Sequence, residues 1–263
     1  MQAIILVAGK GSRLRPFTDH RPKCLVEVHG RPMLSYQLQA LHAAGVRDCV
    51  IVVGHRAGQI QNSVGKRYRD MRISYVENPR YDSTNNIYSL WLARGAVRDD
   101  VLLLEGDLIY DPALLTDLIE MPCDNAAVVD RFHPFMNGTL ILARGDRADM
   151  MVLKRDQGEG FDYGPALKTV NIYKFCYETM TRELMPALGD AIAQGLTDDY
   201  YEMAIAEALD AGRIRMNVLR TGSRVWAEID TVEDLADAQR LHIGPELGAG
   251  VGASDRLARA NWR

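Results

Sequence analysis

Short apolar runs alternate with helix-like segments along the first half of the chain, and this alternation restricts the fold more than any other feature. The runs are AIILVAG (3–9), CVIVVG (49–54), ISYVEN (73–78), VLLLEGD (101–107) and NAAVVD (125–130). Runs that stay apolar on both faces are typical of parallel strands, and each parallel pair needs a long crossover, usually a helix. The pattern therefore predicts an α/β fold with a mostly parallel, Rossmann-like sheet covered by helices on both faces.

The segments between the runs carry helix signals. RPMLSYQLQALHAAG has Pro32 near a first turn and Gly45 as a stop, STNNIYSLWLARG begins on capping residues, and DTVEDLADAQRL has the capping-box spacing at Thr231 and Asp234. After about residue 130, GTLILA, KTVNIYKF and RMNVLR predict the strands of a mixed or antiparallel extension, which we expect to be a small antiparallel one on the acceptor side. No Pro/Ser-rich linker divides the chain, so we expect a single domain over 1–243 and a Gly/Ala-rich C-terminal tail over 244–263.

Composition excludes several classes of protein. The formal charge of −4 and pI near 5.9 argue against a nucleic-acid-binding face. The four cysteines lie far apart with no CxxC pair, which argues against a zinc site or a disulfide framework and predicts reduced thiols. No apolar run approaches the roughly 18 residues of a membrane span, and the N-terminus lacks signal-peptide flanks. We expect a cytoplasmic protein without membrane insertion.

A glycine-rich, cationic loop, LVAGKGSRLRPFTDHRPKCL (6–25), follows the first apolar run. It fits neither the GxxxxGK[ST] P-loop nor the GxGxxG dinucleotide motif, because Leu14 stands where the third glycine belongs. The Gly9 to Gly11 turn brings backbone N–H groups toward an anion, with Arg13 and Lys23 nearby, which suits a polyphosphate. A tight strand-to-helix turn with solvated charges is the plainer interpretation.

The full spacing resembles the signature of the sugar-phosphate nucleotidyltransferase superfamily, LxAGxGxRLxPxT…PKxL. The resemblance implies that the loop binds a nucleoside triphosphate, with Arg13 at the β- and γ-phosphates and Lys23 at the α-phosphate. It also implies a nucleotide-binding set from the loop, in which Ala8, Gly9 and Gly11 provide backbone contacts; the set is Leu6, Ala8, Gly9, Gly11, Ser12, Arg13 and Lys23. Arg13, Lys23 and Asp107 are the implied catalytic residues.

Three carboxylates are candidate metal ligands. Asp107 follows a buried run, where α/β sheets bind ligands, and Glu228 and Asp230 are two residues apart in WAEIDT, so a strand would present both on one face. Asp107 could instead cap a helix, and charges on an exposed edge strand are common. The resemblance assigns Asp107 and Asp230, then Glu228, to a metal, and hard oxygen ligands beside phosphate favour Mg²⁺.

The sequence contains no obvious general base, and the implied reaction requires none. A phosphate or phosphonate oxygen is largely ionised at neutral pH, because its second pKa is near 6. Catalysis then consists of bringing two polyanions together and stabilising charge on the α-phosphate.

A second stretch of the sequence resembles one subgroup of this superfamily. NPxYxxTNNxYSL (78–90) resembles bacterial CTP:phosphocholine cytidylyltransferases and relatives that activate small phosphonates such as 2-aminoethylphosphonate. Thr84, Asn85 and Asn86, at an expected helix N-terminus, could bind a base or phosphate, with Ser89 one turn on; helix capping is the alternative.

The acceptor site is expected beside the antiparallel extension. TDDYYEM concentrates acidic and aromatic residues that could form a cage for a substituted ammonium group, although an ordinary helix start fits equally well. Arg131 and His133, or a lysine such as Lys168, would meet the acceptor phosphate. The candidate acceptor residues are Ser89, Arg131, Lys168, Asp199, Tyr200, Tyr201 and Glu202.

We therefore expect a cytidylyltransferase with Mg²⁺, CTP and a phosphocholine-like or aminoethylphosphonate-like acceptor as its small-molecule partners. A homodimer is compatible with these features. The alternatives are a sugar-1-phosphate uridylyl- or guanylyltransferase and a non-catalytic nucleotide-binding regulator.

Overall fold

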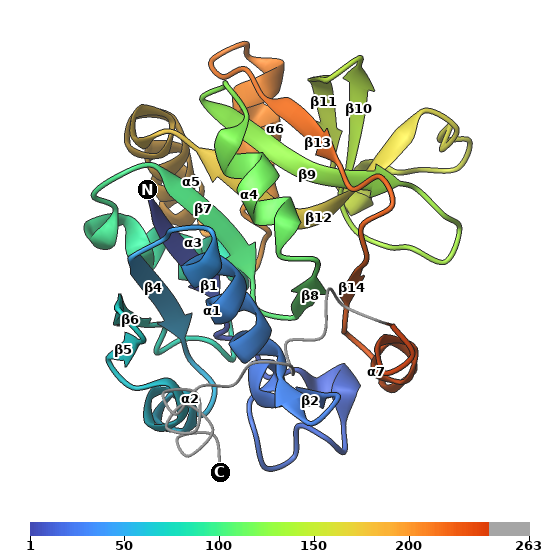
Figure 1. Ribbon diagram of the computed structural model, residues 1–263. Helices are drawn as coiled ribbons and strands as arrows, with labels where there is room; N and C mark the ends of the chain where they lie inside the picture. The colour runs from blue at the N-terminus through green and yellow to red at the C-terminus, as the bar shows by residue number, and fades with distance from the viewer. Residues whose placement is uncertain (242–263) are drawn as a thin grey trace.

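The computed structural model describes residues 1–241, and the predicted tail over 244–263 lies outside this range. The main sheet has the strand order β10-β11-β13-β9-β12-β7-β1-β4-β6-β5 (Figure 1). The strands are β1 (Gln2–Leu6), β4 (Asp48–Val53), β5 (Arg67–Tyr68), β6 (Met71–Glu77), β7 (Val101–Glu105), β9 (Asn125–Arg131), β10 (Leu140–Arg144), β11 (Arg147–Val152), β12 (Ala166–Phe175) and β13 (Asn217–Arg220).

Strands β1, β4, β6 and β7, all from the first half of the chain, form a parallel part of the sheet, whereas the short β5 pairs antiparallel with β6. β1 lies between β4 and β7, with Ile4 opposite Val50 on one side and Leu103 on the other, and β6 extends the parallel set beyond β4. All five residues of β1 are buried, as expected for a strand covered on both faces. The predicted α/β class is confirmed.

The later strands continue the same sheet. β12 pairs antiparallel with both β7 and β9, and all ten of its residues are buried. β13 runs parallel to β9, while β10 and β11 pair antiparallel. KTVNIYKF therefore lies in the middle of a mixed sheet, and the antiparallel part of the fold is continuous with the parallel part.

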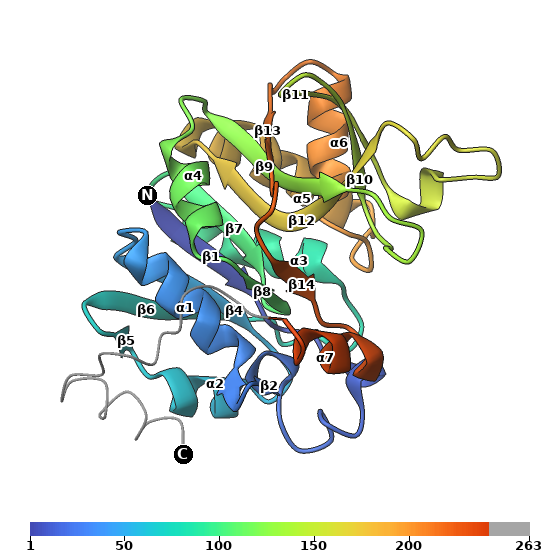
Figure 2. The ribbon, with the colours of Figure 1, turned by 45° about the vertical axis from the view of Figure 1, so that its right-hand side comes forward.

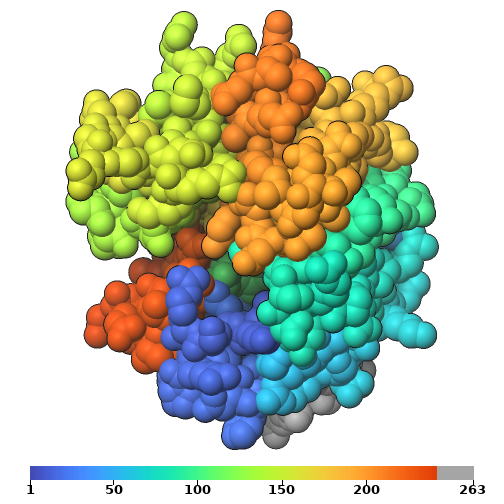
Figure 3. All heavy atoms as spheres, turned by 180° about the vertical axis from the view of Figure 1, so that it is seen from behind, coloured from blue at the N-terminus to red at the C-terminus, as the bar shows by residue number. Residues whose placement is uncertain are grey.

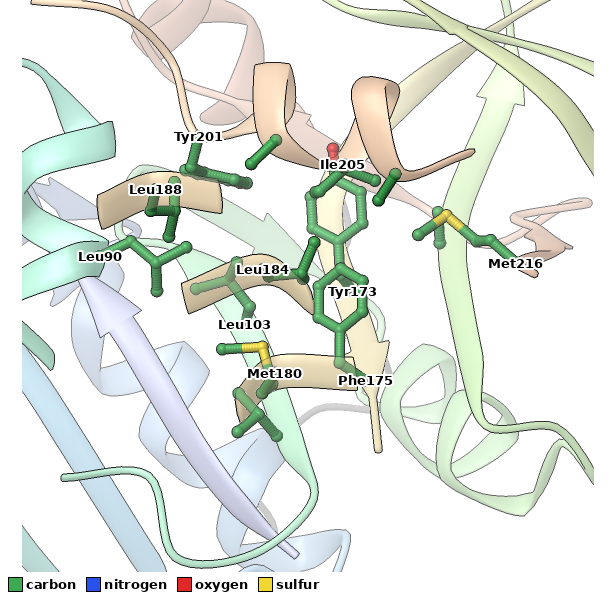
Figure 4. Close-up of a cluster of buried hydrophobic side chains, with 14 of the residues drawn as sticks. Leu90, Leu103, Tyr173, Phe175, Met180, Leu184, Leu188, Tyr201, Ile205 and Met216 are labelled. Carbon is green, nitrogen blue, oxygen red and sulfur yellow. The ribbon is translucent and has the colours of Figure 1, made fainter. Parts of the chain in front are cut away.

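Helices cover both faces, as predicted (Figures 1 and 2). One face packs against α1 (Met33–Ala43), α2 (Ala57–Val64) and α4 (Ala113–Glu120). The other packs against α3 (Asn86–Leu92), the π-helical turn Thr179–Leu184, α5 (Met185–Ala193) and α6 (Glu202–Asp210). Figure 4 shows the core on this second face, where Tyr173 and Phe175 of β12 meet side chains of α5 and α6.

The remaining elements are short. They are β2 (Glu27–Val28), β3 (Arg31–Pro32), β8 (Leu108–Tyr110), β14 (Trp226–Glu228), α7 (Val232–Ala238) and the 3₁₀ turns Ser12–Leu14, Lys23–Leu25, Ala93–Ala96 and Lys154–Asp156. A separate apolar cluster, which includes Leu14, Ile109, Ile229 and Leu235, joins the N-terminal loop to β8, β14 and α7. This cluster brings the two ends of the described chain together.

The predicted helix signals match the structure. α1 follows Pro32 directly, Asn85 caps α3, and Thr231 and Asp234 form the predicted capping box of α7. All four cysteines lie within the described residues and carry free thiols, as expected. Over residues 1–241, the helices are too short or too polar to cross a membrane.

Candidate active site

A cleft of about 1480 Å³ opens at the carboxyl ends of β1 and β7. Figure 3 shows the hollow between the blue N-terminal loop and red C-terminal segment below and the yellow-green and orange segments above. Pockets for one small molecule are commonly about 300 to 1,000 Å³. The cleft is therefore large enough for two ligands side by side.

The glycine loop forms one wall and is fixed against Lys23. Gly11 has a φ of +61°, and a Cβ there would lie 2.7 Å from the Cβ of Lys23, so this position requires glycine. The Thr18 hydroxyl donates a hydrogen bond to the Gly11 carbonyl at 2.9 Å. The loop and the lysine are therefore held as one unit.

Lys23 lies between two carboxylates. Its Nζ is 2.5 Å from Asp107 Oδ2 and 2.6 Å from Asp230 Oδ1, and Arg13 Nη2 is 2.8 Å from Asp230. Burial alone would lower the pKa of Lys23, but the two carboxylates raise it overall. Burial likewise opposes ionisation of Asp230, whose pKa is nevertheless lowered by Lys23. The structure thus brings the predicted catalytic residues together with Asp230 as a charged cluster.

Asp107 is placed by a tight turn after β7. A Cβ on Gly106 would lie 2.1 Å from Val7 Cγ1, so only glycine lets the chain pass β1 at this point. The Gly106 N–H donates to the Leu6 carbonyl at 3.0 Å. Asp107 therefore follows directly from the end of a buried strand.

Asp230 is placed by the pairing of β14 with β8. The Ile229 N–H donates to the Asp107 carbonyl at 2.9 Å, and Asp234 accepts hydrogen bonds from the backbone N–H groups of Asp230 and Thr231. The capping box of α7 thus also fixes the second carboxylate.

The Asp107 and Asp230 pair fits a divalent cation. Asp107 Oδ1 is buried and has no hydrogen-bond partner among the described residues, which leaves a hard oxygen donor available. Residues 1–241 contain no group of three His, Cys, Asp or Glu side chains arranged to hold a metal, so further ligands would come from phosphate or water. Glu228 is engaged elsewhere: it lies 3.3 Å from Lys168 Nζ and accepts a hydrogen bond from Asn171.

Further into the cleft, half-buried polar groups link β7, α3 and the start of α6. Asn86 donates to Glu105 Oε1 at 3.0 Å and accepts a hydrogen bond from the Tyr201 backbone N–H, also at 3.0 Å. Glu202 is 5% exposed, and its Oε2 has no hydrogen-bond partner among the described residues. Burial raises the pKa of Glu202 to about 7 and that of Glu105 well above its usual range.

The predicted nucleotide-binding residues all line the cleft, namely Leu6, Ala8, Gly9, Gly11, Ser12, Arg13, Lys23, Thr84, Asn85 and Asn86. The side chains of Thr84, Asn85 and Asn86 also form hydrogen bonds within the protein. Asn85 caps α3, Thr84 donates to the Arg80 carbonyl, and Asn86 joins Glu105 to Tyr201. Of the two predicted roles, ligand binding and helix capping, the structure thus shows helix capping for Asn85.

Five of the predicted acceptor residues line the cleft: Ser89, Lys168, Asp199, Tyr200 and Glu202. Ser89 accepts a hydrogen bond from Asn78, and Asp199 pairs with Arg155 at 2.5 Å. Lys168 is 2% exposed and donates to the Thr169 carbonyl at 2.7 Å.

Tyr201 and Arg131 lie away from the cleft, which corrects their predicted roles. Tyr201 is 1% exposed and packs edge-on to Tyr173 in the core (Figure 4), because it points to the sheet side at the start of α6. Arg131 is exposed, since its neighbour Asp130 takes the cleft-facing position and successive strand residues point to opposite faces. With Tyr200 53% exposed, the predicted aromatic cage is not assembled.

Sequence reasoning missed several residues that line the cleft: Asn78, Glu105, Asp130, Asn171 and Trp226. Glu105 could have been identified from the sequence, because it directly follows the apolar residues 101–104 in VLLLEGD. Trp226 donates to Asp130 Oδ2 at 2.6 Å, a pairing between distant segments that no local pattern indicates. Asn171 has a φ of +59° within β12, where the register shifts, and nothing in KTVNIYKF marks it.

Comparison with known proteins agrees with this geometry. Residues 3–169 match the MobA-like NTP transferase domain. The CMP-5'-(3-aminopropyl)phosphonate synthase of Streptomyces rubellomurinus is 36% identical over 239 residues, which are 90% of this chain and 38% of that protein. The choline-phosphate cytidylyltransferase of Streptococcus pneumoniae is 34% identical over 118 residues, which are 45% of this chain and 50% of that protein. This chain thus spans half or less of the length of these two relatives.

The fold is shared with solved structures. The structure of CTP:phosphocholine cytidylyltransferase from Streptococcus pneumoniae superposes with a TM-score of 0.74 at 22% identity, covering 91% of this chain and 97% of that one. This likeness establishes the nucleotidyltransferase architecture, including the mixed sheet.

Proposed function

Because this chain belongs to the MobA-like NTP transferase domain family, we propose that it is a Mg²⁺-dependent cytidylyltransferase that uses CTP and a small phosphate or phosphonate acceptor. Its products are a CMP-linked acceptor and pyrophosphate. The observation that carries the proposal is the cluster in which Lys23 lies within 2.6 Å of both Asp107 and Asp230 beside the glycine loop.

The reaction is an in-line displacement at the α-phosphorus. An ionised oxygen of the acceptor forms the new P–O bond, the bond to the β-phosphate breaks, and pyrophosphate leaves with the electron pair. The acceptor oxygen is already deprotonated near neutral pH, so no residue has to remove a proton.

The protein contributes binding, orientation and charge. The Lys23 ammonium group neutralises charge on the α-phosphate during attack, and Arg13 with the glycine loop holds the β- and γ-phosphates. Asp107 and Asp230 would hold Mg²⁺, which supplies further charge stabilisation on the phosphates when bound. For Lys23 to reach a phosphate, its ion pairs with the two carboxylates have to give way.

The names of the relatives support CTP and a small acceptor. One is a CMP-aminopropylphosphonate synthase and another a choline-phosphate cytidylyltransferase, whereas relatives named for sugar-1-phosphate transfer are more distant. A non-catalytic nucleotide-binding regulator is disfavoured, since Arg13, Lys23, Asp107 and Asp230 are all present and assembled.

The test is pyrophosphate release over a matrix of nucleotides and acceptors. CTP, UTP, GTP, ATP and dTTP are each combined with phosphocholine, 2-aminoethylphosphonate, 3-aminopropylphosphonate and glucose 1-phosphate, with Mg²⁺ or with EDTA, and Asp107→Asn serves as the inactive control. We expect release with CTP, Mg²⁺ and a small acceptor. The proposal would be refuted if pyrophosphate were released only with glucose 1-phosphate and UTP or GTP. It would also be refuted if turnover were equal in Mg²⁺ and in EDTA.

A further inference from the structure

Glu202 lines the inner wall of the cleft and carries a buried oxygen without a hydrogen-bond partner among the described residues. It is the first residue of α6, it is 5% exposed, and its Oε2 has no hydrogen-bond partner among residues 1–241. Glu105, at the end of β7, lines the same wall and interacts electrostatically with Glu202. A buried carboxyl oxygen without a donor is costly, so it indicates a donor that arrives with a ligand.

The charges around this wall leave a cation missing. Glu202 is buried and Glu105 and Glu228 are half-buried, and the positive group that acts on Glu202 is Lys168. Lys168 is already paired with Glu228 and hydrogen-bonded to the Thr169 carbonyl. Lys23 lies against Asp107 and Asp230 instead. Glu202 therefore has no cationic side chain of its own among Lys23 and Lys168, because both are paired with other carboxylates.

The same wall is unsuited to a quaternary ammonium group. Such groups bind on aromatic faces, because they have no N–H to donate. Tyr201 is in the core, Tyr200 is 53% exposed, and Asp199 is paired with Arg155. At this wall the charged side chains Glu105 and Glu202 offer carboxylate oxygens, which suit a group that carries N–H donors.

We propose that Glu202, assisted by Glu105, binds a primary ammonium group of the acceptor, so that the acceptor is an aminoalkyl phosphonate or phosphate rather than a choline derivative. This rests on the proposed cytidylyltransferase function and specifies its second substrate. The pKa of Glu202, raised by burial to about 7, agrees with a carboxyl that ionises fully only when a cation binds beside it.

The test compares acceptors that differ only at the nitrogen. With CTP and Mg²⁺, kcat/KM is measured for 2-aminoethylphosphonate and 3-aminopropylphosphonate, each against its des-amino and its N-trimethyl analogue. We expect the better amine to exceed both of its analogues by about 100-fold or more, because a site built to receive N–H groups rejects ligands that lack them. A trimethyl or des-amino analogue that reacts as well as the amine overturns the proposal.

Two variants assign the effect to the residue. Glu202→Gln should lower the ratio of amine to des-amino kcat/KM by about tenfold or more. The matched control is Glu207→Gln on the same helix, whose carboxylate pairs with Arg213 at the surface, and it should keep the wild-type ratio. An unchanged ratio in Glu202→Gln overturns the proposal.

Binding measurements separate this inference from the proposed function. Calorimetric titration of the wild-type protein with 3-aminopropylphosphonate and with propylphosphonate, in the presence of CTP and Ca²⁺ in place of Mg²⁺, needs no turnover. Tighter binding of the amine by about tenfold or more supports the ammonium site even if no CMP transfer is seen, and equal binding overturns it. Absence of transfer to every acceptor with every nucleotide would refute the cytidylyltransferase function alone.

Discussion

Substitution of Glu202 by Gln should remove a pH-dependent free-energy cost from the folded protein. Burial raises the pKa of Glu202 from 4.5 to about 7, and in the unfolded chain the carboxyl returns to its ordinary value. Between these two values the folded state holds a proton that the unfolded state has lost. Rising pH therefore favours unfolding, and the cost is complete only above pH 7.

The size of the effect follows from the two pKa values. They differ by about 2.5, and each pKa unit corresponds to about 1.4 kcal/mol, so the full cost is about 3 kcal/mol. Part of it is already present at pH 5, which leaves about 2 to 3 kcal/mol between pH 5 and pH 8. Gln has nearly the same volume and cannot ionise, so Glu202→Gln should gain that amount relative to the wild type over this interval.

The assay is urea unfolding of the wild type, Glu202→Gln and Glu207→Gln at pH 5, 6, 7 and 8, without nucleotide or acceptor. The difference between chains cancels the titration of the groups that they share. Glu207 is at the surface, so its substitution should leave the pH dependence unchanged. If the free energies of unfolding of Glu202→Gln and the wild type differ by the same amount at every pH, burial does not perturb this carboxyl and the reasoning is wrong.

Three further predictions follow from the site and the core. Lys23→Ala should lower kcat for pyrophosphate release by about 10³-fold with an unchanged circular dichroism spectrum, because the group that neutralises the α-phosphate is lost; near-normal turnover would contradict its role. Gly106→Ala should lower the free energy of unfolding, measured in urea, by about 1 to 3 kcal/mol, because a Cβ would lie 2.1 Å from Val7 Cγ1. An unchanged urea midpoint of unfolding would contradict the tight turn. Tyr201→Ala should lower the free energy of unfolding by about 3 kcal/mol and Tyr200→Ala by under about 0.5, measured the same way; equal losses would place Tyr201 outside the core.

The fold class was predictable because a strand that is buried on both faces has a continuous apolar run in its own sequence. β1, β4 and β7 are apolar apart from one terminal residue each, namely Gln2, Asp48 and Glu105, and that property can be recognised without knowing their neighbours. The position of β12 was not predictable in this way. Its insertion between β7 and β9 depends on pairing between strands that are far apart in the sequence. The local sequence KTVNIYKF does not indicate whether the strand lies at the edge or in the centre of the sheet.

Within the site, predictability followed the motifs. Lys23 and Asp107 lie in or beside patterns whose spacing fixes their geometry, and the structure joins them at 2.5 Å. The sequence did not distinguish Tyr201 from Tyr200 or Arg131 from Asp130: Tyr200 and Asp130 line the cleft, whereas Tyr201 is in the core and Arg131 is exposed away from the cleft. Adjacent side chains point in different directions in any strand or helix, so a pattern that locates a segment does not yet choose the residue within it.

The joining of β14 to β8 also determines how this enzyme fold can be divided. The match to the MobA-like domain ends at residue 169, whereas Lys23 meets Asp230, 207 positions further along the chain. A hybrid protein that exchanged everything after residue 169 would replace Asp230 of the carboxylate pair along with Glu202, while it would keep Asp107 and Glu105. A graft intended to change only the proposed acceptor contact at Glu202 therefore has to leave Trp226–Glu228 and the residues that follow to Asp234 with the N-terminal loop.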